Sequence, residues 1–307
     1  MNKFNKYLFN LVVIFIFILT TSAFSLPKGF PKCVNSDVNK SDYCPMESKL
    51  GHKLIMVDFT SRWDVAQIKW IKKRIFGDAL ISTTPPYHRI SYLKIDGTPP
   101  HSQEYVYSKC RFKTGKKTKF EGDKVNKKCE GIDFIQTIYK TWHSQIKEVE
   151  MNFFPENEEA KQSLIYEYII HVLREYATDF GSDYETRELV IVTDLMQYSE
   201  RVNFFKHCKS AAEKLKPKKK QKADKCGTFE QLMKKEKSFA NYINRTMPTK
   251  EMLKNLKVTV LFMNHSYQTK KDLYITLEKL WLGLFNHMGI EIENPEKFEI
   301  IPQIDIL

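Results

Sequence analysis

The chain has 307 residues, of which 42% are hydrophobic and 13% aromatic, and a formal net charge of +12. This composition excludes an intrinsically disordered chain, because disordered segments are poor in apolar and aromatic residues. The basic charge favours an anionic partner, but the sequence has no nucleic-acid-binding motif, so nucleic acid is the weakest candidate.

The first 25 residues have the pattern of a secretory signal peptide. Lys3 and Lys6 precede an apolar stretch at 8–19, and Ala23 and Ser25 fit a small-residue cleavage site. The alternative is a retained anchor, but this apolar run is short for a membrane span of about 20 residues. We therefore expect a cleaved signal, a periplasmic or secreted protein, and no membrane span after cleavage.

Six cysteines follow the signal, an even number that is typical of disulfides in an oxidising compartment. No C-x-x-C pair occurs, which disfavours a zinc site. Sequential pairing closes three short polar loops. It predicts the disulfides Cys33–Cys44, Cys110–Cys129 and Cys208–Cys226.

Two lysine-rich segments, 109–129 and 208–226, are each bracketed by one of these cysteine pairs and read as basic insertions. They are either solvated loops or contacts for an anionic surface. Either interpretation leaves them outside the core of the domain.

Short apolar runs alternate with segments of helical periodicity along the rest of the chain. After an irregular segment at 26–52, we expect strands at 53–59, 88–95, 104–107, 187–194 and 256–263, and one more in the tail. The expected helices span 62–76, 132–149, 163–180, 203–215, 229–244 and 270–288. This alternation predicts one α/β domain over 53–307. It should be a doubly wound, mostly parallel sheet with helices on both faces, a three-layer arrangement.

Two of the predicted strands end in an acidic residue that hydroxyl residues follow. Asp58 precedes Thr60 and Ser61, and Asp194 precedes Ser199. Open parallel sheets bind ligands at the carboxyl ends of their strands. We therefore expect the strands around Leu54 and Leu189 to be adjacent and parallel, with both acids at one edge.

These residues resemble the metal-binding loops of von Willebrand factor A-type (vWA) domains, in particular the divergent, exported proteins of this type in bacteria. The family binds a divalent ion through a D-x-S-x-S loop, a Thr from a second loop and an Asp from a third. The resemblance implies that Asp58, Thr60, Ser163 and Asp194 form such a site, and that the chain is a protein-interaction module for adhesion or assembly.

The fifth position of the first loop is Arg62, where the family has Ser. A cation cannot be a metal ligand, so the resemblance implies a degenerate site that binds Mg²⁺ or Ca²⁺ weakly. A partner's acid could complete the metal's coordination, or Ser61 and Arg62 could meet that acid directly. The structural alternative is that Asp58 and Thr60 cap the next helix while Asp194 bonds loop amides.

The competing enzymatic interpretation is a metal-dependent hydrolase that uses Asp58 and Asp194. It needs a further carboxylate, for which Asp64, Glu188 and Glu200 are the candidates nearby in the sequence. The sequence has no G-x-S-x-G, P-loop or H-E-x-x-H motif. A binding module is therefore preferred to an enzyme.

Overall fold

In the computed structural model, a six-stranded sheet organises the part of the chain that the structure describes. That part comprises residues 43–44, 49–61, 63–114, 132–154, 160–174, 179–204, 228–263, 271–290, 292 and 299–301, all within one compact unit, Cys33–Leu307. The strands are β1 (Gly51–Asp58), β2 (Arg89–Ile95), β3 (Tyr107–Cys110), β4 (Thr186–Thr193), β5 (Leu256–Met263) and β6 (Glu299–Ile301). Their order is β3-β2-β1-β4-β5-β6, and only the β2–β3 pair is antiparallel.

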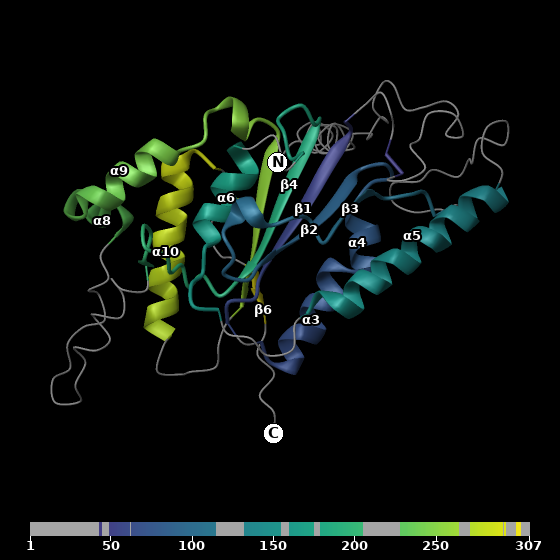
Figure 1. Cartoon of the computed structure of the whole chain (residues 1–307), viewed down its shortest axis with the longest axis horizontal. Coiled ribbons are helices and arrows are strands. Elements are labelled where there is room, and N and C mark those ends of the chain that lie inside the picture. Colours follow the sequence, from purple (N-terminus) through teal and green to yellow (C-terminus); the bar gives the residue numbers. More distant parts are fainter. Residues whose placement is uncertain are drawn as a thin grey trace, which may run out of the picture. The chain divides into compact units, whose positions relative to one another are not determined.

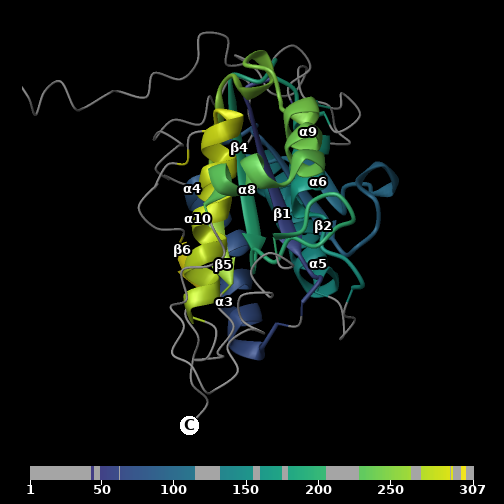
Figure 2. The same ribbon diagram turned by 90° about the vertical axis from the view of Figure 1, so that its left-hand side faces the viewer.

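Helices cover both faces of this sheet, which confirms the predicted three-layer α/β class. One layer contains α6 (Ile165–Arg174), α8 (Phe229–Lys235), α9 (Lys237–Thr246) and α10 (Lys271–Met288). Figure 1 shows this layer on one side of the strands, and Figure 2 views it from that side. The other layer contains α3 (Val65–Ile75), α4 (Gly77–Thr83) and α5 (Ile132–Phe153). Among the described residues, no helix is long and apolar enough to cross a membrane.

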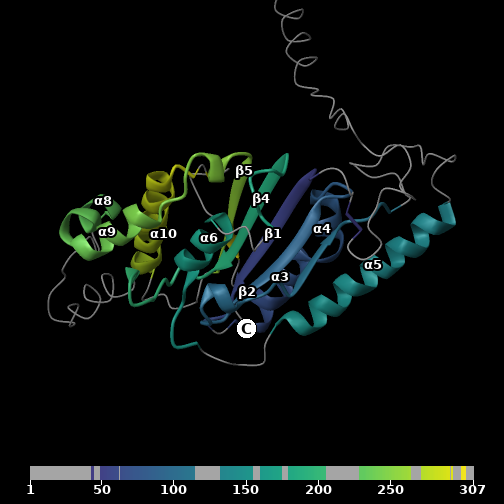
Figure 3. The same cartoon turned by 45° about the horizontal axis from the view of Figure 1, so that its top comes forward.

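The central strands are buried on both faces, as their unbroken apolar runs predict. In β1, Leu54 and Met56 belong to the core beneath α6 and α10, whereas the alternate residues Ile55 and Val57 are buried on the opposite face. Leu54 pairs with Leu189 of β4 in a parallel ladder. Figure 3 shows β5, β4, β1 and β2 side by side. The predicted adjacency of the β1 and β4 strands is therefore confirmed.

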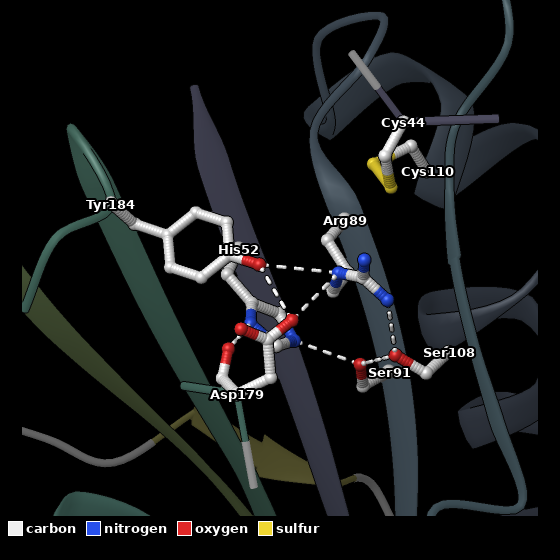
Figure 4. Close-up of a disulfide and its surroundings, with 8 residues drawn as sticks. All are labelled: Cys44, His52, Arg89, Ser91, Ser108, Cys110, Asp179 and Tyr184. Atoms are coloured by element: carbon white, nitrogen blue, oxygen red, sulfur yellow. Dashed lines mark hydrogen bonds and ion pairs between the residues drawn. A yellow bond between two sulfur atoms is a disulfide. The ribbon is translucent and has the colours of Figure 1, made fainter. Parts of the chain in front are cut away.

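A disulfide between Cys44 and Cys110 shows that the sequential pairing was wrong for two of the three predicted pairs. Cys110 ends edge strand β3, and its Cα lies 4.9 Å from that of Cys44 (Figure 4). This bond excludes Cys33–Cys44 and Cys110–Cys129. Closeness along the chain was a poor guide because sheet pairing brings Cys110 to a segment 66 residues earlier. The predicted Cys208–Cys226 pair lies outside the described residues.

A buried chain of hydrogen bonds lies near this disulfide, at the amino ends of β1 and β2 (Figure 4). Burial lowers the pKa of His52 to about 3, so its ring is neutral at pH 7. Its Nδ1 lies 3.0 Å from the carbonyl oxygen of Asp179, which can only accept, so Nδ1 carries the proton. Nε2 then accepts from Ser91 Oγ at 2.8 Å. Ser91 accepts from Ser108, which accepts from Arg89 Nη1.

We expect the stability of the protein to fall as the pH drops from about 6.5 towards 3. In that window an unfolded His52 binds a proton that the folded protein excludes, so the folded state loses on the order of 4 kcal/mol. Denaturant unfolding at several pH values should show a smaller loss in His52→Gln. The exposed His101→Gln is the matched control, and an unchanged pH slope in His52→Gln would contradict this account.

Candidate functional site

The strand order reverses between β1 and β4, and such a switch point is where open α/β sheets bind ligands. Asp58 is the last residue of β1, and Asp194 directly follows β4. Both side chains are almost fully buried, with exposed fractions of 1% and 2%. Two carboxylates from neighbouring strands therefore lie at the carboxyl edge of the sheet, beside its switch point.

Asp58 accepts hydrogen bonds from three chain segments. Its Oδ1 accepts from the amide of Thr60 at 3.0 Å and from the Thr60 hydroxyl at 2.5 Å. Its Oδ2 accepts from Thr193 Oγ1 at 2.8 Å and from Ser163 Oγ at 3.5 Å. Each hydroxyl that donates here also has lone pairs, so the donor set is rich in hard oxygen atoms.

Asp194 is held by the loop after β1 and by its own turn. Its Oδ2 accepts from Ser61 Oγ at 2.6 Å, and its Oδ1 accepts from the amide of Met196 at 2.9 Å. Leu195, between them, has a left-handed φ of 63°, and its amide donates to Thr193 Oγ1. The turn thus fixes the carboxylate towards the β1 loop, at the cost of an unusual backbone conformation for leucine.

The charge of Asp194 affects the pKa of Asp58. Burial, and then the negative charge of Asp194, raise the pKa of Asp58 to about 7, although hydrogen bonds from Thr60 and Thr193 act in the opposite direction. Near neutral pH, Asp58 is therefore partly protonated. A bound cation would favour the ionised form of Asp58.

The structure brings together the four predicted ligands Asp58, Thr60, Ser163 and Asp194. Ser61 joins them through Asp194, and Arg62 lies outside the described residues. The predicted structural alternative is correct only for Asp194, which does accept a loop amide. The first turn of α3 is capped instead by Asp64, whose Oδ1 accepts from the Gln67 amide at 2.7 Å.

The three acids proposed for a hydrolase have other positions. Asp64 caps α3, Glu188 forms a 2.9 Å ion pair with Lys53, and Glu200 is exposed on the surface. Among the residues with described positions, no group of three or more His, Cys, Asp or Glu residues could hold a metal ion.

Two features of the site were not predicted from the sequence. Thr193 directly precedes the predicted acid Asp194 and is the last residue of the same buried strand. Its position could therefore have marked it as a member of the site. Behind Ser163, Glu167 is the only acid in the apolar stretch of α6. Glu167 accepts from Ser199 Oγ at 2.6 Å and from Gln197 Nε2 at 2.9 Å, and burial raises its pKa.

These contacts connect the site to a neighbouring open pocket. The backbone of Ser163 pairs with that of Tyr198 through two hydrogen bonds of 2.9 Å. Tyr198 is 47% exposed and lines an open pocket of about 590 Å³ together with Arg201 and Glu236. The exposed residue Tyr198 is therefore backbone-paired with Ser163, whose hydroxyl donates to Asp58.

The evidence for this site comes from the residues themselves. No protein-family model matches the chain, and no curated protein matches it.

Proposed function

We propose that the chain is an exported protein-interaction module of the vWA-like type, used in adhesion or assembly, and that its partner binds at the Asp58–Asp194 site. One observation carries the proposal: two buried carboxylates at the ends of adjacent parallel strands each accept hydrogen bonds from hydroxyl groups at the switch point. The order of the loops supports it, because Thr60, Ser163 and Asp194 come from successive loops as the resemblance requires. The disulfide supports an oxidising, periplasmic or extracellular address.

The donor set fits a weakly held Mg²⁺ or Ca²⁺ ion. Carboxylate and hydroxyl oxygens are the ligands that these ions prefer, and the hydroxyls of Thr60, Ser61 and Ser163 can turn a lone pair towards a cation. Two carboxylates provide little negative charge, so we expect weak affinity until a partner's acid completes the coordination. The ion would supply the positive charge that attracts this acid.

A direct salt bridge from Arg62 to the partner's acid is the second route to the same function. In this route the guanidinium of Arg62 supplies the positive charge, so no metal ion is required. Tyr198, which is exposed and backbone-paired with Ser163, supports a partner surface in both routes, because aromatic anchors are enriched at protein interfaces.

Calorimetric titration of the protein with Mg²⁺ and Ca²⁺ separates the two routes. We expect binding in the range of about 10⁻⁴ to 10⁻³ M, stronger at pH 8 than at pH 6 because the ion must displace the proton of Asp58. Asp58→Asn and Asp194→Asn should abolish it. Asp96→Asn is the matched control, since Asp96 also follows a strand but is exposed.

The absence of divalent binding by the wild type would contradict the metal route. A partner captured from the native envelope would then be expected to lose affinity in Arg62→Ala and to be indifferent to a chelator. If neither the acids nor Arg62 affected any interaction, this end of the sheet would be structural and the proposed function would be wrong.

A further inference from the structure

An open pocket of about 550 Å³ lies between α3, the start of α4 and the end of α5. Figure 1 shows these three helices together in one layer. Its volume falls within the range of pockets that bind small molecules, about 300–1,000 Å³. It is lined by Val65, Ile68, Lys69, Lys72, Lys73, Phe76, Gly77, Asp78, Ala79 and Glu150.

One face of helix α3 packs against the core, and another lines the pocket. Gln67, Ile71 and Ile75 are buried beneath it. The pocket receives the residues at positions i, i+3, i+4, i+7 and i+8 from Val65, a spacing that defines one side of a helix. The outward face is thus apolar at its start and carries three lysines at its end.

Charges of opposite sign line the two walls of the pocket. The lysines all come from α3, whereas Asp78 lies in the first turn of α4 and Glu150 near the end of α5. Within the described ranges, none of these five side chains forms an ion pair. Lys72 contacts the ring of Phe154, with its Nζ 5.1 Å from the ring centroid. The pocket therefore offers cationic and anionic groups to a ligand that could meet both.

Apolar groups also line the pocket. Val65, at the start of α3, is 79% exposed. Phe76 and Ala79 add apolar lining. Large exposed apolar side chains beside a hollow are typical of a binding surface.

We propose that this pocket binds a single molecule of a zwitterionic, single-chain phospholipid. The phosphate would lie against Lys69, Lys72 and Lys73, the amine would face Asp78 and Glu150, and the acyl chain would cover the apolar lining. A purely anionic lipid would leave the acidic wall without a counter-charge. A flat bilayer surface could not enter a concave pocket. The proposal is independent of the switch-point function.

Four dodecyl amphiphiles below their micellar concentrations test it: dodecylphosphocholine, dodecyl phosphate, dodecyltrimethylammonium and dodecyl maltoside. Calorimetry reports binding to the full chain. We expect dodecylphosphocholine to bind most tightly, dodecyl phosphate next, and the maltoside at least about tenfold more weakly than dodecylphosphocholine, a difference that the charged walls provide.

Two sets of variants locate the contacts. Substituting Gln for Lys69, Lys72 and Lys73 together should weaken both phosphate-bearing probes about tenfold or more and leave the maltoside unchanged. Asp78→Asn with Glu150→Gln should remove the preference for dodecylphosphocholine over dodecyl phosphate. Three exposed lysines in the opposite layer, changed to Gln together, form the matched control: Lys234, Lys235 and Lys237.

Equal binding of all four probes would overturn the proposal. It would show that only the apolar lining binds the probes, and such a surface would suit a helix of a partner protein. The absence of binding would also overturn it. A third contrary result is lysine-dependent sedimentation with vesicles of phosphatidylethanolamine and phosphatidylglycerol without binding of the monomeric probes. That outcome would assign the surface to a membrane instead.

Discussion

Replacing Asp58 by Asn is expected to raise the free energy of unfolding at pH 8 by about 2–4 kcal/mol and to abolish divalent-ion binding. The folded pKa of Asp58, about 7, lies well above the ordinary value of an aspartate, 3.8. Its contribution to stability is therefore fully present below pH 3.8 and is lost as the pH rises through 7. At pH 8 the native state holds two buried like charges, and the variant holds one.

The side-chain amide that Asp58→Asn introduces can also keep the hydrogen bonds. Its oxygen would accept from Thr60, and its nitrogen would donate to the hydroxyl oxygens of Thr193 and Ser163, which have free lone pairs. Chemical denaturation at pH 5 and pH 8 measures the effect, with Asp96→Asn as the control. A destabilised Asp58→Asn protein at pH 8 would mean that this carboxylate is needed for the fold rather than kept for a ligand.

Arg187→Met is expected to destabilise the protein by about 3 kcal/mol or more. The guanidinium of Arg187 is buried at the start of β4. It donates to the carbonyl oxygens of Phe180, Met252 and Lys254, at distances of 2.5 to 3.2 Å. Methionine keeps the aliphatic stem but leaves these carbonyls without their donor.

Equilibrium denaturation measures the loss of stability. Arg187→Lys should restore only part of it, because a lysine ammonium can donate to some of these carbonyl oxygens but not to all of them. Arg245→Met, an exposed change on α9, controls for the loss of charge. A change of less than about 1 kcal/mol in Arg187→Met would show that water replaces the lost donors.

The central strands and both acids of the site could be predicted because they depend on local patterns. β1 and β4 are apolar runs that end at Asp58 and Asp194, and chain order alone places parallel strand ends at one edge. The strand β5 and a strand in the tail, β6, were also predicted from local sequence patterns. The predicted helix 270–288 is also confirmed as α10, after which Gly289 has a φ of 74° that is typical of a helix C-cap.

Elements that depend on tertiary packing were missed or misplaced. One helix was expected over 229–244, but Glu236, with φ −106° and ψ 83°, separates α8 from α9 in a window without Gly or Pro. The edge strand β3 begins at Tyr107, three residues after its predicted start, because a four-residue edge strand carries little pattern. Helix α4 was not predicted; it begins directly after α3, at Gly77, whose φ is 59°.

The Asp58–Asp194 site joins parts of the chain that are far apart in sequence. Ser163 reaches Asp58 across 105 residues, and Thr193 reaches it across 135. Such non-local contacts form late, because a long loop must first close. A nascent or truncated chain that stops before β4 would hold Asp58 in a half-built site without its partner carboxylate. Any ligand of this site would therefore bind only to completely folded molecules. By mass action, such a ligand would stabilise the β1–β4 pairing that forms the site.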